Sequence, residues 1–157
     1  MTGSVPAMSL DQFTVSLRIR HPSIDPAEIT RTLGFEPEHA WRAGDPRRPL
    51  PGQAPGGTYH ESYWKGELRE LDAGLRGALD TEAMLLQAVV RLRRVQPFLS
   101  RLQAEAATIE LCVELAGASE YSCALSPQLL KLLARAGICL VLEVSAEKQV
   151  TERRKAG

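Results

Sequence analysis

The chain has 157 residues, a length that fits one domain of ordinary size. Hydrophobic residues make up 44% and charged residues 24%, so neither a disordered nor a fibrous protein is indicated. The 19 basic and 19 acidic residues balance, which argues against general affinity for nucleic acid or for an anionic membrane. No apolar run approaches the roughly 18 residues of a membrane span.

The N-terminal segment and the cysteines indicate the cellular compartment in which we expect the protein. Residues 1–10 lack a charged region followed by an apolar one, so no secretory signal is expected. The three cysteines lack paired spacing, which is typical of a reducing cytoplasm. We predict a cytoplasmic protein with a flexible N-terminus over residues 1–10, one domain over 11–146 and a charged tail over 147–157.

The first predicted elements are a strand and a capped helix. Residues 13–20 alternate apolar and polar side chains, as a half-buried strand does. Asp25 is then placed as an N-cap before Pro26 at the first helical position, and Gly34 can end the helix in the left-handed conformation. Residues 35–58 are rich in proline and glycine and predict a long loop. An aromatic-rich strand follows over residues 59–68.

The second half of the chain begins with a longer helix, and residues 109–137 then repeat the order of strand and capped helix seen at residues 13–34. Thr81 can cap a long amphipathic helix that Pro97 interrupts near Gln96, with helix resuming to about Ala106. Residues 109–115 alternate as a strand. Residues 125–130 repeat the opening of the first helix, Gly137 ends that helix, and residues 138–145 form a last strand.

The order of these elements predicts an α+β fold. We expect a single, mostly antiparallel four-stranded sheet with helices packed on one face, in a ferredoxin-like topology with an extra helix. The apolar positions of the strands predict a shared core, formed by Phe13, Val15, Leu17, Ile19, Ile109, Leu111, Val113, Leu115, Ile138, Leu140 and Leu142. The helices are expected to meet it with Ile29, Leu33, Leu85, Val89, Leu92, Leu129 and Leu133.

A combination of short motifs carries a family resemblance. The motifs are the helix opening at residues 24–29, then Leu33-Gly34-Phe35-Glu36-Pro37, Trp41-Arg42-Ala43-Gly44-Asp45, Trp64, and the helix and strand of residues 125–142. With them the chain resembles, from about Gln12 to Ser145, the bacterial family called domain of unknown function 4279. The resemblance implies a small bacterial α+β domain, and it carries over no catalytic residue.

The long loop contains the first candidate site. An indole beside guanidinium groups could bind a carboxylate or a phosphate. The alternative, which we favour, is that Trp41 anchors the loop and Asp45 accepts backbone hydrogen bonds in a turn. The candidate ligand- or partner-binding residues of this loop are Trp41, Arg42, Asp45, Arg47 and Arg48.

The polar face of the sheet is the second candidate. Arg18 and Arg20 share a strand face, and Glu110, Glu114 and Glu143 lie on the polar faces of the last two strands. This face is either simply solvated or an association surface for a protein partner or a second copy, with a homodimer slightly favoured. We expect neither nucleic acid nor membrane as a partner.

The three histidines raise the question of metal binding and catalysis. His21, His39 and His60 lack metal-site spacing, so we expect no metal and no cofactor. The favoured hypothesis is a non-enzymatic binding or protein-interaction module, of which a toxin-neutralising immunity protein is one example by analogy. The alternative is a small metal-dependent or hydrolytic enzyme using His21, His60 and Asp45.

Overall fold

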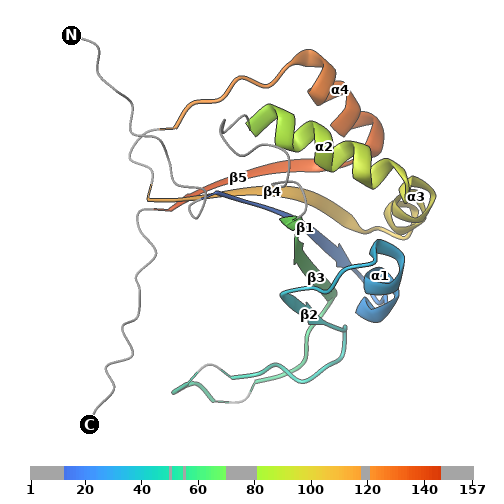
Figure 1. The fold of residues 1–157 in the computed structure, drawn as a ribbon. Helices are drawn as coiled ribbons and strands as arrows, with labels where there is room; N and C mark the ends of the chain where they lie inside the picture. Colours follow the sequence, from blue (N-terminus) through green and yellow to red (C-terminus); the bar gives the residue numbers. More distant parts are fainter. Residues whose placement is uncertain (1–12, 50, 55, 70–80, 118–120, 146–157) are drawn as a thin grey trace.

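The computed structural model describes residues 13–49, 51–54, 56–69, 81–117 and 121–145 (Figure 1). The predicted flexible ends, 1–10 and 147–157, therefore lie outside the described residues. The elements in chain order are β1 (Phe13–His21), α1 (Pro26–Leu33), β2 (His39–Trp41), β3 (Ser62–Glu67), α2 (Thr81–Arg93), α3 (Gln96–Ala104), β4 (Thr108–Ala116), α4 (Pro127–Ala136) and β5 (Cys139–Ser145). The predicted α+β class is confirmed.

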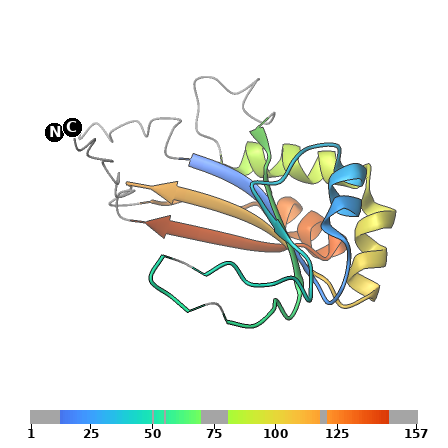
Figure 2. The same cartoon turned by 90° about the horizontal axis from the view of Figure 1, so that it is seen from below.

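The described strands form one mixed sheet in the order β2-β3-β1-β4-β5. The pairs β2–β3, β3–β1 and β1–β4 are antiparallel, whereas β4–β5 is parallel because α4 carries the chain back across the sheet. The helices lie together on one face (Figure 1, Figure 2). The expected number of four strands is wrong, because the three-residue β2 lies inside the segment predicted to be a loop.

Local capping explains where α1 and α4 begin and end. The Asp25 carboxylate accepts a hydrogen bond from a backbone N–H of the first turn of α1, and the Ser126 hydroxyl does the same in α4. Gly34 and Gly137 close the two helices at positive φ, which glycine adopts without strain. Both predicted helices are confirmed. None of the helices in the described ranges is long and apolar enough to cross a membrane.

A break separates α2 from α3 where proline predicts one. Helix α2 ends at Arg93, and helix α3 begins at Gln96, one residue before Pro97. Pro97 has no backbone N–H to continue the ladder of α2, so the chain starts a new helix there. Thr81, expected to be a cap, is the first residue of α2, and its hydroxyl shares a hydrogen bond of 2.6 Å with the Tyr121 hydroxyl.

The core lies between the sheet and the helices. The predicted apolar positions of β1 and β4 are all buried, and β3 adds Trp64, which is fully buried. Burial fades from Ile138, the residue before β5, at 6% exposed to Leu142 within β5 at 45%. The prediction that Leu142 is a core residue is therefore wrong. The strand is the edge of the sheet, and its end extends beyond α4 (Figure 2).

Trp64 connects β3 to α1. Its Nε1 donates a hydrogen bond of 3.0 Å to the Thr30 hydroxyl, and its ring meets Phe35 edge-on with centroids 5.2 Å apart. Gly66, two residues along the same strand, lies under this ring: a Cβ built there would lie 2.5 Å from the indole and 2.8 Å from Phe35. Gly66 therefore makes room for the Trp64 ring.

Candidate functional site

The predicted site residues fall into two groups. Arg18 and Arg20 belong to β1 and lie on the helix-free face of the sheet. The others belong to the segment between β2 and β3 or to β2 itself. These are Trp41, Arg42, Asp45, Arg47 and Arg48.

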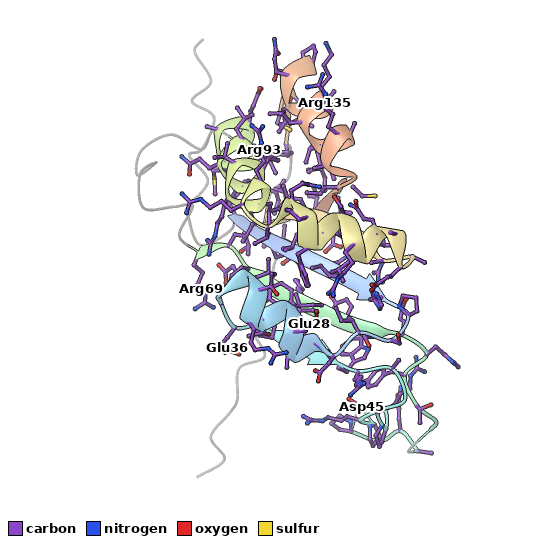
Figure 3. The ribbon with its side chains drawn as sticks, turned by 90° about the vertical axis from the view of Figure 1, so that its right-hand side faces the viewer. Glu28, Glu36, Asp45, Arg69, Arg93 and Arg135 are labelled. Atoms are coloured by element: carbon purple, nitrogen blue, oxygen red, sulfur yellow. The ribbon has the colours of Figure 1, made fainter. Side chains whose placement is uncertain are left out.

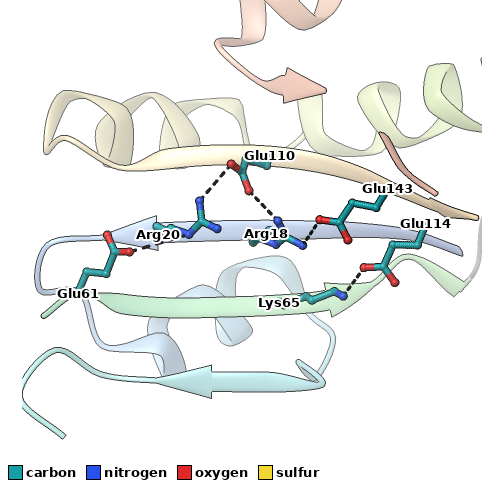
Figure 4. A network of polar contacts seen from close by, with 7 residues as sticks. All are labelled: Arg18, Arg20, Glu61, Lys65, Glu110, Glu114 and Glu143. Atoms are coloured by element: carbon teal, nitrogen blue, oxygen red, sulfur yellow. Dashed lines mark hydrogen bonds and ion pairs between the residues drawn. The ribbon is translucent and has the colours of Figure 1, made fainter. Parts of the chain in front are cut away.

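An ion-pair network covers the middle of the helix-free face (Figure 4). Glu110 on β4 accepts from Arg18 at 3.3 Å and from Arg20 at 3.2 Å, and Arg18 also reaches Glu143 on β5 at 3.0 Å. Lys65 on β3 reaches across β1 on the same face and pairs with Glu114 on β4. The arginine pairs that could have crossed to a second copy are therefore made within one sheet.

Small side chains lie under these long pairs. Ser16 on β1 and Cys112 on β4 are opposite each other in the register, and both are fully buried although they share the helix-free face. The Lys65–Glu114 and Arg18–Glu143 pairs each span an intervening strand, so their stems shield it from water. Cys112 is therefore shielded from water although it lies on the helix-free face.

Burial and charge together set the protonation of this network. Burial is the largest single effect on Arg18 and Lys65 and disfavours their charged forms. Hydrogen bonds to Glu143 and Glu114, together with the charges around them, outweigh it in sum, so both pKa values are raised. Burial also raises the pKa of the Cys112 thiol, an effect that nearby Arg18 partly offsets. A neutral, buried Cys112 is a poor nucleophile, which argues against chemistry at this cysteine.

Removing one charge from the network tests whether it stabilises the sheet. We expect Glu110→Gln to lower the free energy of unfolding by about 1–2 kcal/mol, because two guanidinium groups lose a shared, largely buried carboxylate. The matched control is Glu143→Gln, which removes an exposed carboxylate and should cost less than about 0.5 kcal/mol. Urea unfolding at two salt concentrations measures both, and equal costs would contradict a central role for Glu110.

The predicted loop is a β-hairpin that extends β2 and β3. Beyond the strands, Gly44 N–H donates to the Tyr59 carbonyl at 2.8 Å and Tyr59 N–H donates to the Asp45 carbonyl at 3.0 Å. A bridge between Pro46 and Thr58 continues the pairing. We call the described residues 38–49, 51–54 and 56–61 the β2–β3 hairpin; it projects from the sheet at the edge opposite to β5 (Figure 1).

Trp41 stacks with two tyrosines at the base of the hairpin. The Tyr63 and Tyr59 rings lie nearly parallel to the indole, with centroids 4.3 and 4.5 Å away, and the Arg47 guanidinium lies 5.7 Å from the Tyr59 centroid. The assignment of Trp41 to a loop is wrong: it belongs to β2 and is half-buried. Sequence reasoning missed Tyr59 and Tyr63 as its partners, because the pairing depends on a strand too short to detect.

Asp45 shapes the first turn of the hairpin. Its carboxylate accepts a hydrogen bond of 2.9 Å from the Arg42 backbone N–H, and Gly44 between them has a φ of 88°. The Arg42 side chain points elsewhere, with its guanidinium 4.0 Å from the Asp25 carboxylate. Asp45 therefore has a visible structural role in positioning the residues that follow.

Two open hollows flank the hairpin. One, of about 910 Å³, includes His60 and Glu61, and the other, of about 630 Å³, includes Glu38 and Asp45. Five residues line both hollows: Trp41, Arg47, Arg48, Pro49 and Tyr59. The structure thus brings most of the predicted loop residues together with an aromatic surface, and it leaves Arg18 and Arg20 apart from them.

The histidines do not form the metal site of the alternative hypothesis. His21 is buried, its Nδ1 accepts from two backbone N–H groups at 2.9 and 3.0 Å, and its Nε2 lies 2.9 Å from a Glu105 carboxylate oxygen. Both ring nitrogens are thus occupied in the turn before α1, whereas His60 is exposed on the hairpin. Among the residues that the structure describes, no group of three or more His, Cys, Asp or Glu side chains could hold a metal ion.

These features define a class of small α+β domain with an ion-paired, helix-free sheet face and a projecting aromatic hairpin. The chain belongs to the family described as Domain of unknown function (DUF4279), whose model matches residues 11–147. The family resemblance seen in the sequence is therefore confirmed. No curated protein and no solved structure matches this chain.

Proposed function

We propose that the protein is a non-enzymatic binding module that recognises an acidic segment of a partner protein with the β2–β3 hairpin. The observation that carries this proposal is the placement of Arg47 and Arg48 beside Trp41 and Tyr59 in both hollows. Residues 46–60 contain no Asp or Glu, so these two arginines give this part of the hairpin a positive charge.

The chemistry of this surface suits a protein better than a small molecule. Trp, Tyr and Arg are the residues most enriched among those that dominate protein–protein binding. The stacking of Trp41 with Tyr59 and Tyr63 holds the platform in place before binding, which lowers the entropy lost on association. Guanidinium groups at the rim add electrostatic steering and bidentate hydrogen bonds to carboxylates.

Selection from a random peptide display library tests the proposal. The wild-type domain should enrich peptides rich in Asp and Glu, and their binding should weaken as salt rises. Arg47→Glu combined with Arg48→Glu should reduce the affinity for a selected peptide by at least about tenfold.

The matched control reverses two arginines far from the hairpin. Arg93 and Arg135 are exposed on α2 and α4, at the other end of the molecule from Asp45 (Figure 3). Arg93→Glu combined with Arg135→Glu makes the same change in net charge and should leave binding unchanged. Enrichment of no acidic peptide, or equal loss in both double variants, would overturn the proposal.

The compartment and the biological role of the module can be proposed more closely. We propose that the module acts in the bacterial cytoplasm, which the three unpaired cysteines support. An immunity-type role, in which the acidic segment belongs to a toxin, is one form of the binding function. The test of the immunity-type role is whether a purified toxin binds the wild-type domain and whether the Arg47 and Arg48 substitutions weaken that binding.

We also propose that β1 to β4, with α1 and the α2–α3 pair, form a ferredoxin-like unit to which α4 and β5 are added. What supports this is the order β2-β3-β1-β4 with every pairing antiparallel, and the helical segments that follow β1 and β3. Superposition of an experimental structure on ferredoxin-like domains tests it.

A further inference from the structure

The outer edge of β5 is unpaired within the described chain. The sheet ends at this strand, which has seven residues, Cys139–Ser145. Leu142 is 45% exposed and Val144 is 56% exposed. A strand at the edge of a sheet presents backbone donors and acceptors that another strand can use.

This edge has few of the features by which proteins usually prevent such pairing, and its one charged side chain, Glu143, is bound to Arg18. Residues 139–145 contain no proline, glycine or lysine, and five of the seven are apolar or cysteine. By contrast, the other edge strand, β2, has only three residues, a length that limits pairing. The sequence of β5 therefore favours a partner strand at one edge of the sheet only.

The backbone of β5 shows which residues would pair. The Ser145 carbonyl accepts a hydrogen bond of 2.9 Å from Gly117 N–H at the end of β4. In a parallel pair, both backbone polar groups of one residue point to the same neighbour, and alternate residues point the other way. The groups of Leu140, Leu142 and Val144 therefore point away from β4, toward the free edge.

We infer that two copies of the chain associate through an antiparallel β5–β5 pairing centred on Leu142. This register is the one that pairs all seven residues of the strand. It places Leu142 opposite Leu142 of the second copy, and Leu140 opposite Val144. In this register the outward-pointing backbone groups of Leu142 bond to those of Leu142 in the second copy. The groups of Leu140 bond to those of Val144 in the same way.

Charge is compatible with this register. Glu143 faces Val141 of the second copy, so no like charges are opposed across the two-fold axis. The Glu143 carboxylate is already bound to Arg18 within its own sheet. The exposed Leu142 and Val144 side chains lie on one face of both strands, where the second copy covers them.

The dimer leaves the proposed recognition surface free. Because β5 and β2 are opposite edges, pairing through β5 places the two β2–β3 hairpins at the far ends of a continuous sheet. The association therefore goes beyond the proposed binding function and does not depend on it. Arg47→Glu combined with Arg48→Glu should leave the dimer mass unchanged.

Sedimentation equilibrium over micromolar concentrations tests the dimer. We expect a dimer for the wild type, and for Leu142→Lys a dissociation constant raised at least about tenfold, because the two-fold axis opposes the two lysines. The matched control is Leu130→Lys on α4, a leucine that is 48% exposed but lies on a helix and not on the edge strand, and this variant should remain dimeric. A monomeric wild type, or a dimer that Leu142→Lys does not weaken, would overturn the inference.

A cross-link tests the register itself. Cys139 faces Ser145 of the second copy, at positions whose backbone points away from the partner and whose Cα atoms are close enough for a disulfide. With oxidised glutathione, Ser145→Cys should give a disulfide-linked dimer whose linked peptides join Cys139 to position 145. The same substitution with Cys139→Ser should lose that link. Links between the two copies of position 145 would overturn the centring on Leu142.

Discussion

Replacing Trp64 with alanine should lower the free energy of unfolding by about 3–5 kcal/mol. The side chain is fully buried, and its loss leaves a cavity between β3 and α1. It also removes the hydrogen bond to Thr30 and the edge-on contact with Phe35. Urea unfolding followed by circular dichroism measures the loss.

Trp41 provides the comparison, because its indole is less buried than that of Trp64. Trp41→Ala removes two stacking contacts at the sheet edge from a half-buried ring, and we expect a cost of about 1–2 kcal/mol. The difference reflects burial, since both substitutions remove the same atoms. Equal shifts of the two unfolding midpoints would show that Trp41 is as central to the fold as Trp64.

Gly66→Ala should destabilise the domain by about 2–3 kcal/mol although it adds a single methyl group. The added Cβ would overlap the Trp64 indole at 2.5 Å and the Phe35 ring at 2.8 Å, and neither ring is a flexible chain end. A core packed this tightly accepts the methyl only if the rings or the strand move. The same unfolding experiment measures the cost.

A double substitution separates this clash from other effects of glycine. In a Trp64→Ala background, the ring closest to the new Cβ is absent and Phe35 has space to move. Gly66→Ala should then cost less than about 1 kcal/mol, which gives a coupling energy of more than about 1 kcal/mol between the two positions. Additive costs would show that Gly66 serves the strand backbone rather than Trp64.

Local sequence signals identified most of the elements correctly. The helices that Asp25 and Ser126 cap, and the break at Pro97, depend on residues within one or two turns of each other. The alternation of β1 and β4 also showed which side chains enter the core, because the side-chain period of a strand is a local property. These parts follow from short-range geometry, and each was visible in the sequence.

The candidate site was predicted in part. The sequence singled out Trp41, Arg47 and Arg48, whose residue types suit binding, and the structure gathers them around the same hollows. It could not show that Tyr59 and Tyr63 stack on Trp41. That contact requires the register between β2 and β3, which a three-residue strand among prolines and glycines does not reveal.

Thus the sequence alone determined the capped helices, the buried faces of β1 and β4, and the family. Only the tertiary structure decided which charged side chains meet, that Cys112 lies beneath them, and that β5 is a parallel edge strand. The reason is physical: caps and side-chain periods join residues close in the chain, whereas strand order and ion pairs such as Arg18–Glu143 join residues far apart in it. Their geometry is set when the whole sheet assembles.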